Sequence, residues 1–391
     1  MKILYYNDSL RVPHGSGTHA KEVFHALKRI PGIEVHAFSE EAHSLSESPS
    51  KSTWLKSAFQ KFPYCIRLAR ALWLRDYRAL VPDLINYGND SWVVFFRSDL
   101  RINLLRHIKR NSRVSLLCAE VNAIICDEAP YWLPLRGLWV KHEIRHLNHA
   151  DLIMVVSNYL KRQLVSGGID GAKILVNQNG ANTNHFNPNK WTRDAELRRL
   201  WGVPDGSFVF GYVGGMECFR KLPLVVKIFS DFAHDHPSAH LVMIGSGSDA
   251  ERIADARLAL PAELRQRIHL PGPLPYENAP LAMASFDCAI FPFSNPYGSP
   301  QKLFEYLAME LPVLGPEVPA VTEIFKDTYH MRLAIQDGSN LRTLFEEMLQ
   351  NPGKNRQMAA CGRNLVVGHY TWDANARRLY DFLKLHLPTH Q

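Results

Sequence analysis

The stretch Ser299-Pro300-Gln301-Lys302-Leu303-Phe304-Glu305-Tyr306-Leu307-Ala308-Met309-Glu310-Leu311-Pro312-Val313-Leu314 predicts a loop that leads into a helix and then into a buried strand. Ser299 and Pro300 are favourable at a helix start, and Pro312 ends the helix before the strand begins. A helix N-terminus presents free backbone N–H groups and a partial positive charge, so it favours phosphate.

Two charged side chains lie near the start of this helix. Lys302 places a cation at the positive end of the helix dipole, which favours an anionic partner. Glu305 lies three residues further on the same face, and its carboxylate can accept two hydrogen bonds from a vicinal diol such as a ribose. We therefore predict that one helix end holds both the phosphate and the sugar of a nucleotide.

The stretch resembles the donor-site helix of GT-B glycosyltransferases, in particular the retaining family-4 type, in its Ser-Pro-x-Lys-Leu-Phe-Glu-Tyr subgroup. Other segments resemble further parts of that family and follow in the family's order: 177–180 with 186–188, 210–215, 241–247, 268–272 and 284–292. The resemblance covers nearly the whole chain. It implies that the chain binds a nucleotide-sugar and transfers the sugar.

The expected architecture is α/β, because apolar strand runs alternate with helical spacing in both halves of the chain, which favours parallel sheets covered by helices on both faces. By resemblance we expect a GT-B arrangement of two doubly wound Rossmann-like domains that face each other across a cleft. The predicted domains are residues 1–186, which bind the acceptor, and 187–369, which bind the donor. Residues 370–391 are expected to form a helix that returns to the first domain.

The resemblance implies a donor-binding role for a set of residues spread over both domains: Gly15, Gly17, Gly214, Gly215, Arg220, Lys221, Gly272, Pro273, Ser299, Pro300, Lys302, Leu303 and Glu305. The family pattern is altered at three positions. Tyr297 stands where the family has the first acid of a Glu-x7-Glu pair. Gly215 stands in place of an arginine, and Arg220 stands in place of a lysine.

Arg220 and Lys221 precede an apolar helical run that begins at Leu222. A basic pair at a helix start is unfavourable for the dipole unless it has an anionic partner. We predict that at least one of the two stabilises the donor diphosphate during catalysis, and arginine can bind a diphosphate through two hydrogen bonds. The alternative is a solvated surface pair.

Glu120 and Asn122 lie in a segment, 118–123, that resembles the acceptor-side loop of the family. Some relatives carry a histidine there that contacts the transferred sugar. We therefore assign Glu120 and Asn122 to the catalytic region, where either could hydrogen-bond a sugar hydroxyl, with a capping or turn role as the alternative.

Residues 15–20 spell Gly-x-Gly-x-x-Ala, which is also a dinucleotide fingerprint. With Glu40 as the ribose acid, this gives an NAD-dependent oxidoreductase as a rival function. In that fingerprint the glycines come directly after the strand, whereas here residues 8–14 intervene. The GT-B resemblance instead makes Gly15 and Gly17 a flexible loop that faces the donor diphosphate, and a purely structural turn is the third alternative.

The net charge of +7 suits phosphorylated substrates or an anionic membrane surface. Residues 51–78 hold seven Lys/Arg, one acid and six aromatic residues, and residues 101–113 add five Lys/Arg and no acid. Either the basic side chains of 51–78 are simply solvated, or this segment docks the protein on anionic lipid. The spacing of basic and aromatic residues favours no nucleic-acid partner. The six cysteines form no C-x-x-C pair, which favours reduced thiols in a cytoplasmic protein. Docking through 51–78 would place that protein peripherally at the inner face of the membrane.

The predicted activity is a retaining, metal-independent hexosyl- or aminohexosyltransfer from a UDP- or GDP-sugar to a hydroxyl of a glycan, glycolipid or other glycoconjugate. No cofactor is expected. The sequence holds no D-x-D triplet, the usual means of holding Mg²⁺ under a diphosphate in a different class of transferase. Besides the oxidoreductase, a non-catalytic nucleotide-sugar-binding protein remains an alternative because of Tyr297.

Overall fold

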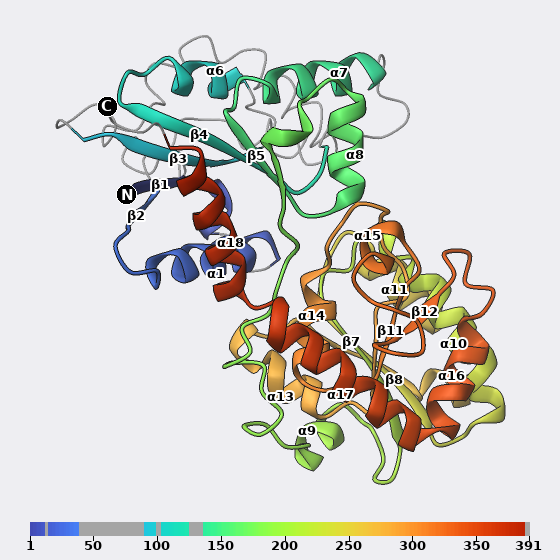
Figure 1. The fold of residues 1–391 in the computed structure, drawn as a ribbon. Coiled ribbons are helices and arrows are strands. Elements are labelled where there is room, and N and C mark those ends of the chain that lie inside the picture. Colours follow the sequence, from blue (N-terminus) through green and yellow to red (C-terminus); the bar gives the residue numbers. More distant parts are fainter. Residues whose placement is uncertain (12–14, 39–89, 99–102, 125–135, 388–391) are drawn as a thin grey trace, which may run out of the picture. The chain divides into compact units, whose positions relative to one another are not determined.

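The computed structural model describes residues 1–11, 15–38, 90–98, 103–124 and 136–387 (Figure 1). The chain divides into two compact units. Unit 1 comprises Met1–Gln178 with Asp373–Gln391, and unit 2 comprises Asn179–Trp372. The unit boundaries therefore lie after Gln178 and Trp372, whereas the predicted domain boundaries lie after residues 186 and 369. The segment 51–78 and Glu40 lie outside the described residues.

Unit 1 is built on a six-stranded, all-parallel sheet in the order β2-β1-β3-β4-β5-β6. Its strands are β1 (Lys2–Tyr6), β2 (Glu34–Phe38), β3 (Trp92–Arg97), β4 (Val114–Val121), β5 (Leu152–Val155) and β6 (Ile174–Val176). The central strands are apolar and almost wholly buried, as expected for a parallel sheet covered on both faces.

The described helices of unit 1 are α1 (Ser16–Lys28), α6 (Asn103–Lys109), α7 (Arg136–Leu147), α8 (Asn158–Ser166) and most of α18 (Trp372–Leu385). Ser157 caps α8, because its Oγ accepts a hydrogen bond of 3.2 Å from the N–H of Leu160. No described helix has both the length and the apolar character needed to cross a membrane.

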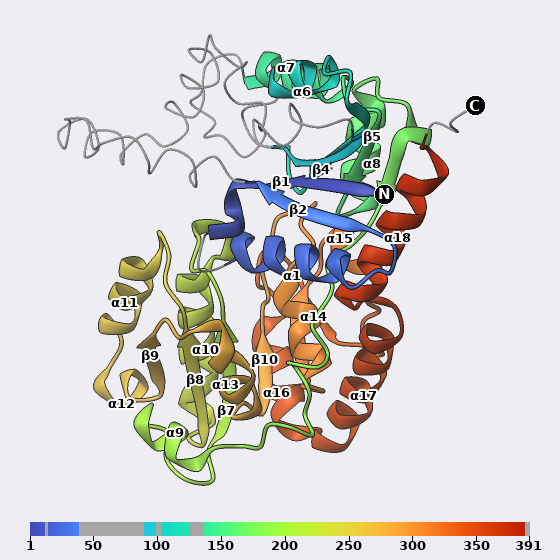
Figure 2. The same ribbon diagram turned by 90° about the vertical axis from the view of Figure 1, so that its left-hand side faces the viewer.

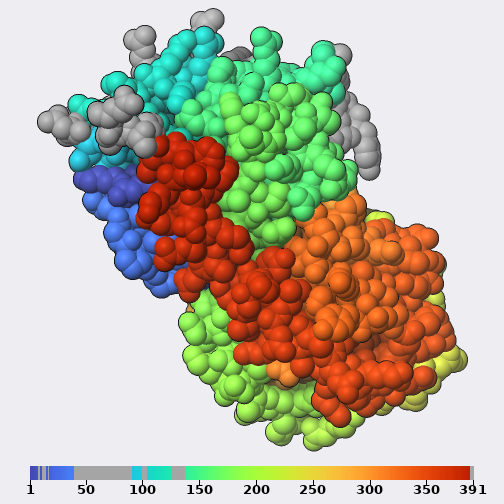
Figure 3. Space-filling view, viewed as in Figure 1, coloured from blue at the N-terminus to red at the C-terminus, as the bar shows by residue number. Residues whose placement is uncertain are grey.

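Helix α18 joins unit 1 through polar contacts. Asn177 donates to the backbone oxygen of Asn375 (3.1 Å) and accepts from Arg378 Nε (2.9 Å). At the start of α18, the carboxylate of Asp373 pairs at 2.7 Å with Arg29, the residue that follows α1. In the space-filling view the red surface of α18 accordingly lies against the blue surface of the α1 region (Figure 3). These bonds explain why the last residues of the chain belong with the first unit.

Unit 2 contains a second six-stranded parallel sheet in the order β12-β11-β10-β7-β8-β9. Its strands are β7 (Phe208–Val213), β8 (Ala239–Ile244), β9 (Ile268–Gly272), β10 (Cys288–Ile290), β11 (Val313–Pro316) and β12 (Arg332–Ala334). Every residue of β8 is buried. The predicted pair of parallel-sheet α/β units is therefore confirmed.

The helices of unit 2 are α9 (Ala195–Leu200), α10 (Leu222–Asp235), α11 (Ala250–Leu258), α12 (Ala262–Arg265), α13 (Ala279–Ala284), α14 (Gln301–Ala308), α15 (Pro319–Thr322), α16 (Leu341–Gln350) and α17 (Pro352–His369). Helix α10 buries residues at helical spacing, among them Val225, Phe229 and Phe232. The rings of Phe229 and Phe232 lie 6.0 and 5.8 Å from that of Phe210 in β7, which ties this helix to the centre of the sheet.

A buried histidine pair links β8 to β9. His240 Nδ1 and His269 Nε2 are 3.0 Å apart, and both residues are nearly inaccessible. Burial, aided by nearby arginines, lowers the pKa of each imidazole to about 4. Both rings are therefore neutral in the folded protein at neutral pH, which allows one nitrogen to donate to the other.

This pair predicts a loss of stability in mild acid. In the unfolded chain each histidine takes up a proton near pH 6.5, whereas in the folded protein it does so only near pH 4. The free energy of unfolding therefore falls as the pH is lowered from 6.5 to 4. We expect the free energy of unfolding to drop by about 2–4 kcal/mol between pH 7 and pH 5 through this pair. Urea unfolding at the two pH values measures it, and the His240→Gln, His269→Gln double variant is expected to lose this component. An unaltered pH dependence in that variant would contradict the assignment.

Candidate functional site

The predicted donor residues of unit 2 gather where the strand order of its sheet reverses, between β7 and β10. In open parallel sheets, ligands bind beyond the carboxyl ends of the strands at such a reversal. The loop after β7 carries Gly214, Gly215, Arg220 and Lys221, and the loop after β10 leads through Ser299 and Pro300 into α14.

Two buried tyrosines hold these loops. The hydroxyl of Tyr306, from α14, accepts from the N–H of Val213 (2.8 Å) and donates to its carbonyl (3.1 Å). The hydroxyl of Tyr212 donates to the carbonyl of Gly215 at 2.5 Å. The end of β7 is thereby fixed to the helix that the sequence predicted as the phosphate-binding element.

Glycine is required where the loops after β7 and β8 meet. Gly245 has a φ of 151°, and a Cβ atom there would lie 1.9 Å from the carbonyl oxygen of Gly214. The N–H of Gly245 donates to the carbonyl of Gly272 at 3.1 Å, which brings the predicted residue Gly272 into the same backbone network. Pro273 follows it and is exposed.

Arg220 is a partly buried cation whose side chain is held by uncharged groups of the described chain. Its Nη1 donates to Ser294 Oγ (3.0 Å) and weakly to the carbonyl of Phe293 (3.4 Å), both in the loop after β10. The guanidinium also lies over the rings of Phe291 and Phe219, at 4.1 and 4.5 Å. No carboxylate of the described residues forms an ion pair with it.

Burial lowers the pKa of Arg220 to about 10, which still leaves it charged at neutral pH. A desolvated cation that forms no ion pair is costly, and the charge of Glu217 offsets that cost only in part, so the presence of Arg220 at a strand-order reversal favours a site for an anion. Lys221 is placed differently. Its Nζ donates to the carbonyl of Gln336 at 2.8 Å, and its own backbone is left-handed with a φ of 48°.

Glu305 is completely buried, and its carboxylate is already bonded within unit 2. Oε2 accepts from Lys302 Nζ (2.6 Å), while Oε1 accepts from Gln301 Nε2 (2.6 Å) and the hydroxyl of Tyr276 (3.1 Å). The anionic partner expected for Lys302 is therefore Glu305 itself. A ribose could reach this carboxylate only after Gln301 or Lys302 moves, so both binding roles stay predictions.

The start of α14 is open. Pro300 occupies the N-cap position and offers no side-chain acceptor, so the N–H groups of Gln301 and Lys302 have no acceptor in the described part of the chain. Ser299 does not cap the helix. It bonds Asn179 instead, through its Oγ (3.0 Å) and its carbonyl (2.6 Å). Leu303 is buried, and its N–H bonds the carbonyl of Pro300.

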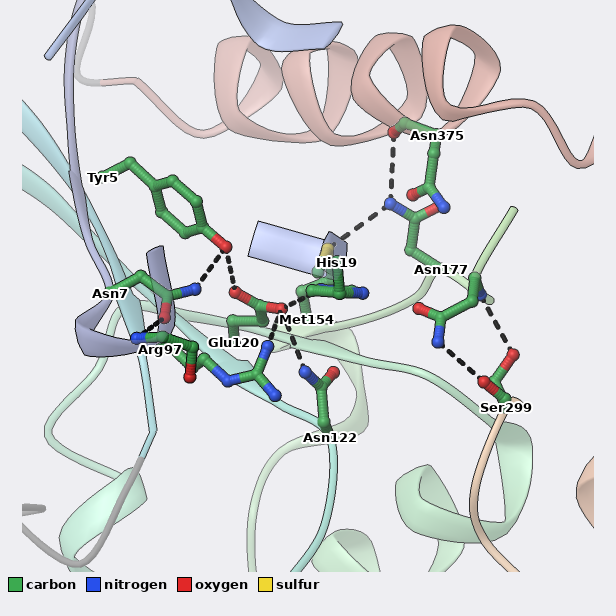
Figure 4. Close-up of polar contacts among 12 residues, drawn as sticks. Tyr5, Asn7, His19, Arg97, Glu120, Asn122, Met154, Asn177, Ser299 and Asn375 are labelled. Carbon is green, nitrogen blue, oxygen red and sulfur yellow. Dashed lines mark hydrogen bonds and ion pairs between the residues drawn. The ribbon is translucent and has the colours of Figure 1, made fainter. Parts of the chain in front are cut away.

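Unit 1 holds a second polar cluster at the carboxyl ends of β1, β3 and β4, again where the strand order reverses (Figure 4). Its centre is Glu120, which is completely buried. The carboxylate contacts Tyr5 OH (2.9 Å), His19 Nε2 (2.5 Å), Arg97 Nη1 (3.4 Å) and Asn122 Nδ2 (3.1 Å). Asn7 completes the group by donating to Tyr5 OH at 2.6 Å.

Burial alone would raise the pKa of Glu120, but His19 and Arg97 outweigh it and bring the pKa to about 2. Burial and this charge raise the pKa of Tyr5 well above its usual value. Glu120 is thus an ionised group sealed from solvent. A sugar could reach it only after a bonded side chain such as Asn122 moves, so its predicted sugar contact stays a prediction. Glu120 orients Asn122 and Arg97, which are both partly exposed.

Sequence reasoning missed Tyr5, Asn7, His19 and Arg97. The available signal was that Tyr5, Asn7 and Arg97 stand at or just after the ends of apolar strand runs. Gly15 and Gly17 lie close to the cluster in sequence, at the start of α1, where Gly15 has a φ of 52°. A short helix, Asp8–Arg11, separates β1 from these glycines, so they do not form the direct strand-to-helix turn of a dinucleotide fingerprint.

The chain is similar to known proteins both in sequence and in fold. Residues 227–381 match a family model described as glycosyl transferase-like. Anabaena HepE, solved with UDP and glucose, has a TM-score of 0.74 at 14% identity over 98% of this chain and 99% of HepE. A glycosyltransferase from Rickettsia africae also has a TM-score of 0.74, at 16% identity over 100% of this chain and 99% of that one.

The fold is of the GT-B type. A curated relative, TuaH of Bacillus subtilis (strain 168), is named as a teichuronic acid biosynthesis glycosyltransferase. It is 27% identical over 190 residues, which are 47% of this chain and 45% of TuaH. The chain therefore aligns with less than half the length of this relative.

Proposed function

We propose that this GT-B protein is a retaining glycosyltransferase of the family-4 type, which moves a hexose or aminohexose from a UDP- or GDP-sugar to a hydroxyl of a glycan, glycolipid or other glycoconjugate. Arg220 carries the proposal. It is a partly buried guanidinium that forms no ion pair with a described residue, at the strand-order reversal of unit 2. A diphosphate is the anion whose charge and geometry an arginine fork fits well.

The open N-terminus of α14 supports the same assignment. Its first two N–H groups and the positive end of its dipole can share the diphosphate charge with Arg220. In this proposal the protein supplies the positive charge that a metal ion supplies in other transferases, so turnover needs no added metal. Lys221 contributes mainly by bracing the loop after β12, because its ammonium bonds Gln336.

The proposed reaction breaks the bond between the sugar C1 and the diphosphate oxygen and forms a bond from C1 to the acceptor oxygen on the same face. The acceptor proton passes to the leaving diphosphate. Charge therefore accumulates on the diphosphate in the transition state, where preorganised donors are most effective. The ribose would bind Glu305 once Gln301 or Lys302 has released the carboxylate.

The relatives support the substrate classes. HepE was solved with UDP and glucose, and TuaH is named for the biosynthesis of an acidic polysaccharide. A UDP-sugar donor and a polysaccharide or glycolipid acceptor are therefore the first substrates to test. The non-catalytic alternative rests on Tyr297, which stands where the family has the first acid of its pair. Donor binding without turnover on any acceptor would favour it.

Thermal stability in the presence of UDP, GDP, their common sugars and NAD(H), without metal, tests the proposal. A ligand at about 100 times its dissociation constant stabilises the fold by about 2.7 kcal/mol. We expect a shift with one nucleoside diphosphate that is weaker in Glu305→Ala and unaltered in Glu263→Ala, an exposed control. A shift with NAD alone would instead assign the Gly15–Gly17 loop as the binding signature and refute the transferase.

A further inference from the structure

Helices α6 and α7 lie side by side on unit 1, as Figures 1 and 2 both show. Their inner faces are apolar and buried, with Leu104 and Ile108 on α6 and Leu147 on α7. Their exposed positions include four basic side chains: Arg106, Arg110, Lys141 and Arg145. We call these four residues the basic face.

A column of aromatic rings runs along α7 beside the basic face. Trp139, His142 and His146 are spaced by three and four residues, which places them on one side of α7, and His149 follows in the turn after the helix. Successive ring centroids are 6.3, 4.2 and 5.6 Å apart. Among the described residues, no three histidine, cysteine or acidic side chains are arranged to hold a metal ion, so a metal site does not explain the column.

The basic face has no compensating acid within the described chain. None of its four side chains forms an ion pair there. The nearby acids are engaged otherwise, because Glu143 is buried and Asp151 is bonded by Lys109 at 2.6 Å. The result is an uncompensated positive surface that spans two helices.

We propose that this face docks the protein on an anionic lipid bilayer. The chemistry of the surface is that of an interfacial helix, in which cations meet phosphate headgroups and apolar side chains enter the acyl boundary. At the start of α7, Leu138 is 59% exposed and Trp139 is partly exposed beside it. A flat array of separated cations with an adjoining Leu-Trp pair fits a surface of many phosphates better than a single small anion.

The histidine column makes this docking sensitive to pH. The groups that act on it come from both helices: Arg106 and Arg110 from the α6 segment, Arg145 from α7, and the histidines themselves. Burial and these cations lower the pKa of all three imidazoles, and no acid opposes them. An anionic surface would offset that repulsion, so docking takes up protons and tightens as the pH falls.

Sedimentation of the full-length protein with vesicles tests the proposal. We expect binding to an equal mixture of phosphatidylglycerol and phosphatidylcholine, weakened by salt, and none to phosphatidylcholine alone. The triple variant Arg106→Gln, Arg110→Gln, Arg145→Gln is expected to bind about 100-fold more weakly. The matched control Lys227→Gln, Lys354→Gln, Arg356→Gln loses the same charge from exposed positions of unit 2 and is expected to bind as the wild type does.

Leu138→Ser separates lipid from other polyanions. We expect it to weaken vesicle binding while leaving binding to heparin or duplex DNA unchanged, because only a bilayer offers an apolar phase to Leu138. Equal vesicle binding by the two triple variants would overturn the assignment of the surface. If Leu138→Ser binds vesicles as the wild type does, and duplex DNA displaces the protein from them, the surface binds polyanions in general. That result would overturn the lipid assignment.

Discussion

Replacing Arg220 by glutamine is expected to lower the kcat of sugar transfer by about 10²–10³-fold, the range for losing one preorganised donor to a developing negative charge. The expected effect on stability has the opposite sign. The guanidinium is desolvated without an ion-pair partner in the described chain, so its removal relieves a burial cost. We therefore expect an unfolding temperature equal to or above that of the wild type.

The two readouts together distinguish a catalytic loss from misfolding. Arg220→Lys keeps a point charge but loses the fork, so an intermediate kcat is expected. Arg356→Gln, an exposed change on α17, serves as the control for both measurements. An unchanged kcat in a folded Arg220→Gln protein would remove Arg220 from the mechanism, and a large drop in unfolding temperature would make it a structural residue.

The strands were largely predictable from sequence because each is a short, buried apolar run between breakers. The donor-domain run 268–272 coincides with β9. Strand β3 was not predicted, because its run Trp92–Arg97 shows no alternation, and a short continuous apolar run does not by itself separate strand from helix.

The two polar sites differ in how much of each could be predicted from the sequence. Arg220 stands out locally, as a cation at a helix start, but its partner Ser294 lies 74 positions away. The unit 1 cluster depends on long-range contacts, since 115 positions separate Tyr5 from Glu120 and 101 separate His19 from it. The fold of the sheet, not any local pattern, brings these side chains to one strand edge. Sequence therefore identified Glu120, but its complete burial and its bonds to Tyr5 and His19 follow from the fold of the sheet.

Replacing Glu120 by alanine is expected to lower the free energy of unfolding of unit 1 by about 3–5 kcal/mol. This is the range for removing one partner of a buried ion pair, about 3–5 kcal/mol, because the other charge stays buried without its partner. The change leaves Arg97 and His19 without their carboxylate and Tyr5 without an acceptor. Hydrogen exchange of the β4 amides under increasing urea measures the stability of this unit alone. Glu34→Ala is the matched control, because this exposed carboxylate pairs with Lys2 at the surface, where ion pairs contribute little to stability.

The pH dependence gives an independent check on Glu120. The pKa of Glu120 is about 2 in the folded protein and near 4.5 in the unfolded chain. Ionisation of Glu120 therefore stabilises the fold fully at pH values above 4.5. That contribution, about 3 kcal/mol, should be lost as the pH falls through the window between the two values. Glu120→Gln keeps the shape without the charge, so its stability should vary less across this window. Equal slopes in the wild type and Glu120→Gln would mean that the carboxyl is not ionised, and the orientation of Arg97 and Asn122 would then need another cause.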